Sequence, residues 1–257
     1  MIPADLEAAI ERAVQVPVLL IASDYDGTLA ELVDHPDDAV PHPTAMVALR
    51  ALAALANTHV AVVTGRGRRD VMRVAQLPPE LIVVGSHGTE FDDGVIRGLD
   101  DTAGQLLAVL TSEVDALAAT TPGARVEHKP ASVALHYRSV EAELVHDLVE
   151  HVLIGPAARD GVHVKLGKRV IELAVVDGHK GTAVEHLRCA HHADAVVFLG
   201  DDATDEDAFT DLRGADIGVK VGHGSTVAGH RVNGPLAVGH VLALLAERRR
   251  SATTTGH

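Results

Sequence analysis

Short runs of apolar, mostly β-branched residues alternate along this chain with longer stretches that have helical spacing. A run that is apolar at every position predicts a strand buried on both faces, which is typical of parallel sheets. The five expected strands are 18–23, 59–64, 81–84, 195–199 and 216–219. The expected helices are 43–56, 68–75, 179–189, 204–212 and 235–249. This alternation predicts an α/β protein with a parallel sheet covered by helices.

The middle of the chain has a different pattern. Two helices, 102–119 and 140–153, are expected there among the four strands 125–127, 132–137, 163–166 and 169–174. A tight turn expected at 166–169 favours an antiparallel sheet, inserted with its helices into the parallel one. We therefore expect a core of residues 1–98 and 179–247 and a second domain at 99–178. The polar end, 248–257, lacks periodicity and is expected to be frayed.

Charge and length limit the function classes. The chain has 257 residues, enough for a core and a second, smaller domain. Its net charge of −14 repels nucleic acid phosphates, so a nucleic-acid partner is not expected. An acidic protein can still act on a phosphorylated metabolite when a metal ion or nearby Lys and Arg residues neutralise the phosphate. The charge therefore points toward divalent cations.

The sequence also carries signals of location. Its apolar runs are shorter than the roughly 18 residues that a membrane-spanning helix needs, so no membrane partner is expected. Acidic residues at Asp5, Glu7 and Glu11 disfavour a secretory signal. The single cysteine, Cys189, excludes an intramolecular disulfide framework and fits a reducing compartment. We expect a cytoplasmic protein that acts as a monomer.

Two aspartates, Asp24 and Asp26, follow the first expected strand in the segment DYDGTL. Residues two apart at the end of a strand point the same way, into the crevice where open α/β sheets bind ligands. Like charges this close are costly unless a cation lies between them. Gly27 would then let the chain turn sharply, so that Thr28 and nearby amides face an anion. A lone pair of this kind is more often an acidic turn, but a second acidic segment favours a ligand site.

That second segment, GDDATDED at 200–207, follows the expected strand 195–199 and opens a helix. It places five carboxylates within seven residues, and Mg²⁺ prefers such oxygen ligands. A calcium-binding EF-hand is excluded, because the alternation of acids breaks at Ala203 and the required glycine is absent. The helix dipole favours acids at a helix start and would explain only about two or three of the five. Together the two acidic strand ends predict a metal site.

A third segment, VVTGRG at 62–67, also ends a strand. The Thr64 hydroxyl and free amides at a helix start suit a phosphoryl oxygen. The G-x-G of this segment also begins a dinucleotide-binding pattern, but Asp70 stands where its third glycine would be. Lys180, in GHKG, opens the helix before the second acidic strand. A single lysine is usually solvated, but a phosphate among carboxylates needs a nearby cation.

In this order, DYDGTL, VVTGR, the lysine of GHKG and GDDATDEDAF resemble the four motifs of haloacid-dehalogenase-like phosphatases, over most of the chain. GSHGTE at 85–90, EHKP at 127–130, LHYR at 135–138 and the GDDxTDE form of the last motif more narrowly resemble the trehalose-6-phosphate phosphatase family. Thr64 replaces a serine that is frequent there and keeps the hydroxyl. The resemblance implies a Rossmann-like core with an α/β cap inserted between the second and third motifs.

The resemblance also implies a chemistry. Asp24 would be the nucleophile that forms an aspartyl phosphate, and Asp26 the general acid that protonates the departing sugar oxygen and later activates water. Thr64 and Lys180 would hold the remaining phosphoryl oxygens. Mg²⁺ would let the anionic nucleophile approach the phosphate. The implied metal-binding residues are Asp24, the main-chain carbonyl of Asp26, and Asp201, with Asp202 or Asp205.

For the sugar, the resemblance implies polar residues in both domains, because polyols need donors and acceptors. The implied substrate-binding residues are Gly65, Arg66, Ser86, His87, Gly88, Glu90, Glu127, Lys129, Arg138 and Glu172. For Glu127, Lys129 and Arg138 the sequence without the resemblance favours a ladder of cross-strand charges on an exposed sheet face. The 17 histidines include no HExxH or similar metal pattern.

These features predict a Mg²⁺-dependent phosphatase of trehalose 6-phosphate that acts in trehalose synthesis. Two alternatives stay open. The same chemistry could serve another sugar or pseudo-disaccharide phosphate, because the catalytic motifs do not select the sugar. A sensor that binds but does not turn over is disfavoured, because Asp24, Asp26, Lys180 and Asp201 are all present.

Overall fold

The computed structural model describes residues 2–92, 98–167 and 169–255. These residues form two compact units: Met1–Asp92 with His179–His257, and Asp93–Gly178. The segment expected to form the second domain, 99–178, lies within the second unit. Each unit has a sheet and a hydrophobic core of its own.

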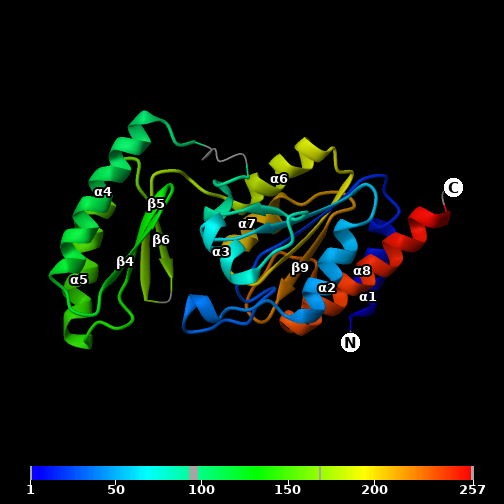
Figure 1. The fold of residues 1–257 in the computed structure, drawn as a ribbon, viewed down its shortest axis with the longest axis horizontal. Coiled ribbons are helices and arrows are strands. Elements are labelled where there is room, and N and C mark those ends of the chain that lie inside the picture. The colour runs from blue at the N-terminus through cyan, green and yellow to red at the C-terminus, as the bar shows by residue number, and fades with distance from the viewer. Residues whose placement is uncertain (1, 93–97, 168, 256–257) are drawn as a thin grey trace. The chain divides into compact units, whose positions relative to one another are not determined.

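The first unit is built on a six-stranded sheet in which every pairing is parallel (Figure 1). The strand order is β10-β9-β8-β1-β2-β3. The strands are β1 (Leu19–Ser23), β2 (Thr58–Val63), β3 (Ile82–Val84), β8 (Ala195–Gly200), β9 (Ile217–Val221) and β10 (His230–Val232). All residues of β1, β8 and β9 are buried, which agrees with the mostly apolar pattern of these strands, although β9 also contains Lys220. The predicted α/β fold class is confirmed.

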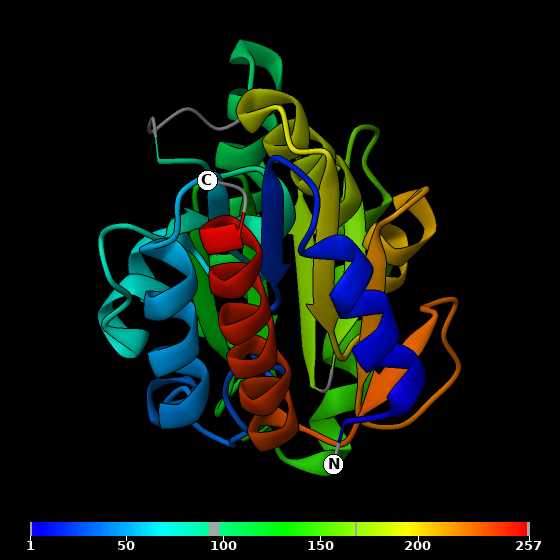
Figure 2. The same ribbon diagram turned by 90° about the vertical axis from the view of Figure 1, so that its right-hand side faces the viewer.

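Helices cover both faces of this sheet. One face packs on α1 (Ala4–Ala13), α2 (Pro43–Ala53), α3 (Arg68–Ala75) and α8 (Pro235–Thr255), and the other on α6 (Lys180–His191) and α7 (Thr204–Asp211). Figure 2 shows α2 and α8 side by side over one face. Short 3-10 turns lie at η1 (Pro36–Asp38) and η2 (Ser86–Gly88).

The strand order defines where a ligand site belongs. From β1 the chain moves outward through β2 and β3, and after the second unit it returns to the other side of β1 through β8, β9 and β10. The direction of winding therefore reverses between β1 and β8. In open α/β sheets the carboxyl ends of the strands at such a reversal form the binding crevice. Both acidic segments follow these two strands.

The second unit is a four-stranded antiparallel sheet of order β4-β5-β7-β6 with two long helices. Its elements are α4 (Asp101–Ala119), β4 (Arg125–Lys129), β5 (Ser132–His136), α5 (Ala142–Ile154), η3 (Pro156–Ala158), β6 (His163–Gly167) and β7 (Val170–Ala174). Alternate residues of the inner strands, such as Val133, Leu135 and Ile171, pack against the helices. In the expected turn at 166–169, Gly167 pairs with Val170 and Lys168 lies outside the described residues.

The expectation of a frayed end at 248–257 is wrong for the described residues up to 255, because α8 continues to Thr255. The reason is Arg249, which is 2% exposed and ties the helix to the rest of the unit. Its guanidinium donates hydrogen bonds to the carbonyls of Val14, Val16, Pro17 and Asn57. Polar composition alone did not reveal that one of these arginines is buried.

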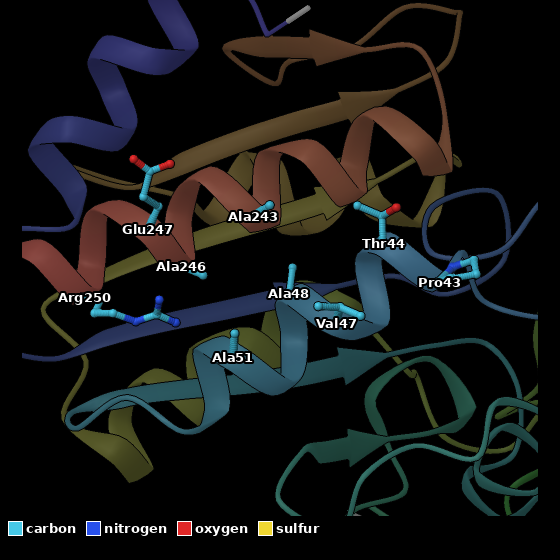
Figure 3. A pocket seen from close by; sticks show the side chains of 9 residues that line it. All are labelled: Pro43, Thr44, Val47, Ala48, Ala51, Ala243, Ala246, Glu247 and Arg250. Atoms are coloured by element: carbon cyan, nitrogen blue, oxygen red, sulfur yellow. The ribbon is translucent and has the colours of Figure 1, made fainter.

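A groove of about 470 Å³ lies on the outer side of α2 and α8 (Figure 3). Its lining consists of Pro43, Thr44, Val47, Ala48, Ala51, Ala243, Ala246, Glu247 and Arg250. None of the expected site residues lines this groove. Within the described residues, no helix combines the length and apolar character needed to cross a membrane.

Candidate active site

Asp24 is the first residue after β1 and is 3% exposed. Its amide donates a hydrogen bond to the Leu199 carbonyl of β8, which extends the pairing of the two strands by one residue. The backbone thereby fixes the carboxylate at the reversal point of the sheet. Burial raises the pKa of Asp24 to about 7, although the charge of Lys180 opposes the rise.

Asp24 is joined there by two carboxylates of the second acidic segment, Asp201 and Asp205. Carboxylate oxygens of the three residues all lie within 4.8 Å of one another. Burial raises the pKa of Asp201 to about 6, and it also raises the pKa of the fully buried Asp205. Three acids at this spacing, of which Asp24 and Asp205 are buried and Asp201 is half-buried, are costly without a cation.

Two glycines make room for these acids. A Cβ on Gly27, whose φ is +82°, would lie 2.1 Å from Asp201 Oδ2. A Cβ on Gly200 would lie 2.2 Å from the carboxyl carbon of Asp205. Asp201 Oδ1 is buried and accepts no hydrogen bond within the described residues. A packed carboxylate with a free oxygen, beside two further acids, fits a hard divalent cation.

Lys180, the first residue of α6, is 1% exposed. Its Nζ lies 2.8 Å from Asp24 Oδ1 and 2.8 Å from Asp205 Oδ1. Burial favours the neutral amine, but the attraction of the two carboxylates outweighs it and raises the pKa of Lys180. The lysine therefore stays charged among these acids, where it balances part of their charge.

Asp26 is held by Arg66, which the sequence analysis assigned to the substrate. Nε and Nη2 of Arg66 each lie 2.7 Å from one oxygen of the Asp26 carboxylate. Such a two-point contact fixes both the position and the plane of the carboxylate. Arg66 Nη1 also donates to the Pro36 carbonyl at 2.9 Å and to Asp70 Oδ2 at 3.1 Å. The structure thus joins the segment VVTGRG to Asp26, the second aspartate of DYDGTL.

Asp202 does not belong to the group of three carboxylates, although its Oδ1 lies 3.7 Å from Lys180 Nζ. Its Oδ1 accepts hydrogen bonds from the amides of Thr204 and Asp205 and from the Thr204 hydroxyl. It therefore caps the start of α7, as short polar side chains do at helix starts. Of the two residues offered as alternatives in the last motif, only Asp205 shares the group with Asp24 and Asp201.

The remaining residues expected in the core lie in two adjoining loops. Thr64 is 1% exposed, and its hydroxyl accepts a hydrogen bond from the Arg66 amide at 3.1 Å. The His87 amide donates to the Thr64 carbonyl at 2.9 Å, and the His87 ring packs where a Cβ on Gly65 would lie. Ser86 and His87 both have positive φ, of 50° and 55°. Consecutive strained residues of this kind cluster at functional sites.

Glu90 and Gly88 shape the same loops. Glu90 Oε2 accepts a hydrogen bond from the Arg68 amide at 2.7 Å, and the Glu90 carbonyl accepts one from the Gly85 amide. Gly88 has a φ of +106°, and a Cβ there would lie 2.7 Å from the His179 carbonyl, next to Lys180. In this structure both residues hold the backbone around Thr64 and Lys180.

The other expected residues belong to the second unit. Glu172, on β7, accepts hydrogen bonds from Lys129 Nζ and from Ser132 Oγ, both at 2.7 Å. Glu127 Oε2 lies 2.8 Å from His136 Nε2, and this hydrogen bond lowers the pKa of Glu127 to about 2. These contacts run across strands, but none of them joins Glu127, Lys129 and Arg138 to one another as the predicted ladder would.

The register of the sheet places these residues on one face. Glu127 pairs with Ala134, Ala134 with Glu172, and Glu172 with Lys165, so the four lie in one row across the sheet. Lys165 was not among the predicted site residues. The available signal was its position in the expected strand 163–166, where residues two apart, such as His163 and Lys165, lie on the same face. Lys165 Nζ donates to the Gly178 carbonyl at 2.9 Å. Arg138 lies outside this row, exposed in the turn after β5.

Comparison with known proteins adds to this geometry. A profile of the family described as Trehalose-phosphatase matches residues 22–238, which include both acidic segments and the whole second unit. The chain belongs to the trehalose-phosphatase family. This confirms the resemblance drawn from the motifs.

Several curated relatives of this chain come from mycobacteria. A trehalose-phosphate phosphatase of Mycobacterium marinum is 36% identical over 219 residues, which cover 81% of this chain and 55% of that protein. One of Mycolicibacterium paratuberculosis is 37% identical over 243 residues, which cover 90% of this chain and 60% of that protein. The chain thus spans little more than half the length of these relatives.

Solved structures share the fold of this trehalose-phosphatase family member. The crystal structure of a trehalose-6-phosphate phosphatase related protein superposes with a TM-score of 0.72 at 25% identity, covering 89% of this chain and 97% of that chain. The C-terminal domain of the Candida albicans trehalose-6-phosphate phosphatase gives a TM-score of 0.77 at 23% identity, covering 96% of this chain and 99% of that chain.

Proposed function

We propose that this chain is a Mg²⁺-dependent phosphatase that hydrolyses trehalose 6-phosphate to trehalose and phosphate, in the cytoplasm. The observation that carries the proposal is the group of Asp24, Asp201 and Asp205 with Lys180, buried at the carboxyl ends of β1 and β8. The family match and the mycobacterial relatives named as trehalose-phosphate phosphatases supply the substrate class. The lone Cys189 supports a reducing compartment.

In the first half of the proposed reaction, a carboxylate oxygen of Asp24 attacks phosphorus and the bond from phosphorus to the sugar oxygen breaks. Asp26 gives its proton to that departing oxygen, so that a neutral hydroxyl leaves. Arg66 holds the Asp26 carboxyl by both oxygens and sets its direction. The Thr64 hydroxyl and the Lys180 ammonium bind the phosphoryl oxygens.

In the second half, Asp26 takes a proton from water, and that water attacks the phosphorus of the aspartyl phosphate. The bond between phosphorus and Asp24 breaks, which frees phosphate and restores the carboxylate. Asp24, Asp201 and Asp205, with the main-chain carbonyl of Asp26, would hold Mg²⁺. When bound, the ion supplies positive charge that offsets the repulsion between carboxylate and phosphate.

The second unit supplies the substrate-specificity cap in this proposal. Glu127, Lys129, Glu172 and Lys165 offer carboxylate and ammonium groups on one sheet face, which suits the hydroxyls of a sugar. Ser86, His87, Gly88 and Glu90 would border the substrate from the core unit. Arg138 is exposed in the turn after β5 and lies outside this row.

The test is phosphate release in the presence of Mg²⁺ from trehalose 6-phosphate, sucrose 6-phosphate, glucose 6-phosphate and mannosyl phosphoglycerate. We expect a preference for trehalose 6-phosphate and its loss in Asp24→Asn, with Asp211→Asn, an exposed acid at the end of α7, as the matched control. Faster release from another member would keep the catalytic residues and replace the substrate. Release from none, by a folded protein, would contradict the proposal.

A further inference from the structure

Lys220 is a buried cation near the carboxyl end of β9, and it belongs to none of the motifs singled out in the sequence. It is the one charged residue of β9, whose other members are Ile217, Gly218, Val219 and Val221. The side chain is 4% exposed. A lysine is almost never buried to this extent unless its ammonium group is paired, so its partners are informative.

Its ammonium group binds the backbone of the second acidic segment. Nζ lies 2.7 Å from the carbonyl oxygen of Asp201 and 3.2 Å from that of Asp202, and donates a hydrogen bond to each. It also lies 3.2 Å from Glu206 Oε1, with which it forms an ion pair. The ammonium group thus donates to two carbonyls of this turn, and the Glu206 carboxylate offsets its charge.

Glu206 connects this contact to a second loop. Its Oε2 accepts hydrogen bonds from the Val227 amide at 2.9 Å and from the Thr226 hydroxyl at 3.1 Å. Lys220 and Glu206 therefore fasten the turn after β8 both to β9 and to the loop that follows β9. The turn that carries Asp201 is thus held through its backbone, while the Asp201 carboxylate packs against Gly27.

We propose that Lys220 is a positioning residue for the metal site. By holding the carbonyls of Asp201 and Asp202, it keeps the Asp201 carboxylate against Gly27, where it faces Asp24 and Asp205. Its positive charge also lowers the cost of bringing these acids together. The inference rests on the proposed function, because it assigns Lys220 to the Mg²⁺ site named there.

The same strand offers a matched control at its other end. Arg188, which is 9% exposed, pairs with Asp216 just before β9, and Asp216 Oδ1 accepts a hydrogen bond from the Val196 amide of β8. This pair also joins β8 and β9 through a buried cation. It lies at the amino ends of the strands, whereas Lys220 lies at their carboxyl ends. Replacing Arg188 tests the loss of a buried ion pair without touching the acidic turn.

The experiment is calorimetric titration of Mg²⁺ alone into the full chain and into Lys220→Met and Arg188→Met, after melting curves have shown that each is folded. Loss of a residue that orients metal ligands usually lowers metal affinity about 10-fold to 100-fold, and we expect this for Lys220→Met. Arg188→Met should bind Mg²⁺ within about twofold of the parent chain. At saturating Mg²⁺, Lys220→Met should keep the parent KM for trehalose 6-phosphate.

If Lys220→Met does not fold, Lys220→Arg serves in its place, with Arg188→Lys as its control. Arginine keeps the charge but moves the donors off the two carbonyls, so a smaller loss of affinity, roughly threefold to tenfold, is expected.

Equal Mg²⁺ affinity in the parent and the Lys220 variant would overturn the inference and leave the proposed function standing. An equal loss in the Arg188 variant would also overturn it, because general loosening of the sheet would then explain the result. A parent chain that binds no Mg²⁺ would remove the metal from the proposed function as well.

Discussion

At the scale of single residues, the site depends on glycines, which have no side chain and so leave room for functional groups. Gly27 and Gly200 leave the space that the carboxylates of Asp201 and Asp205 occupy, so Asp201 packs against the turn after β1 and Asp205 against the end of β8. Gly65 does the same for the ring of His87. A Cβ at any of these positions would move a functional group while leaving the strands in place.

Gly27→Ala tests this use of space. The new Cβ would push the end of the Asp201 side chain by about 1 Å, and a misplacement of that size can lower a catalytic rate about 100-fold. Asp201 can rotate away, so the fold should survive. Alanine at positive φ adds strain of roughly 1–2 kcal/mol.

The control is Gly214→Ala, because Gly214 also has positive φ, of +61°, but no atom lies within 4 Å of its new Cβ. Both variants should melt at similar temperatures, whereas only Gly27→Ala should lose phosphate release. An equal loss of activity in both variants would show that backbone strain, and not the position of Asp201, limits the rate.

At the scale of elements, α8 is locked to the first unit by a contact near its end. Arg249 reaches the segment after α1 and the residue before β2, and it donates to backbone carbonyls of both. Its Nε also donates to the Thr58 hydroxyl at 3.2 Å. One side chain therefore joins three segments that are far apart in the sequence.

Arg249→Met should lower the free energy of unfolding by about 3 kcal/mol, because several buried carbonyls lose their partners. For a chain of this length this corresponds to a fall in Tm of roughly 6–12 °C. Arg248→Met is the neighbouring control, since Arg248 forms an exposed pair with Glu11 at 2.8 Å and such pairs contribute below about 1 kcal/mol. Thermal melts of both variants measure this difference. Equal falls in Tm would show that the Arg249 contacts do not stabilise α8 more than an exposed ion pair does.

The elements that the sequence predicted are those with strong local patterns. β1, β2, β3, β8 and β9 were expected within two residues of their observed bounds, because buried strands keep apolar residues at every position. α1 and β10 were not expected. β10 is only three residues long and includes His230 and Arg231, so it has no pattern to read. The end of α8 was missed because its stability comes from a tertiary contact.

The candidate site was predictable to a similar extent. Motifs located Asp24, Asp201, Asp205 and Lys180, which the fold brings together from three segments. Pairings between distant residues were not predictable. The contact of Arg66 with Asp26 spans 40 positions, and no local pattern indicates which carboxylate an arginine will meet.

At the scale of the whole molecule, the buried apolar residues that the structure describes form three clusters, one on each face of the parallel sheet and one in the second unit, and no residue belongs to two of them. Leu199 belongs to the core of the parallel sheet, and Leu135 to the core between the antiparallel sheet and its helices. Each is at most 1% exposed. Separate cores allow separate opening, because local unfolding follows units that share buried contacts.

Hydrogen exchange can measure this separation. Leu135→Ala should lower the free energy of unfolding of the second unit by about 2–5 kcal/mol. Amide exchange should then become faster in β4 to β7, whereas the exchange rates in β1 and β8 should not change. Leu199→Ala should have the reverse effect. If either variant speeds exchange equally in both units, the molecule opens as a single cooperative body and the expectation fails.

The position of β1 between β2 and β8 has a consequence for synthesis of the chain. Residues 19–23 pair with 58–62 on one side and with 195–199 on the other. One edge of β1 therefore stays unpaired during synthesis until β8 has been made. The whole 93–178 unit emerges in that interval and can fold first. Until residue 199 has emerged, an apolar strand edge stays open to pairing with other nascent chains. Slow translation between residues 178 and 199 should therefore favour aggregation more than an equal pause after residue 200.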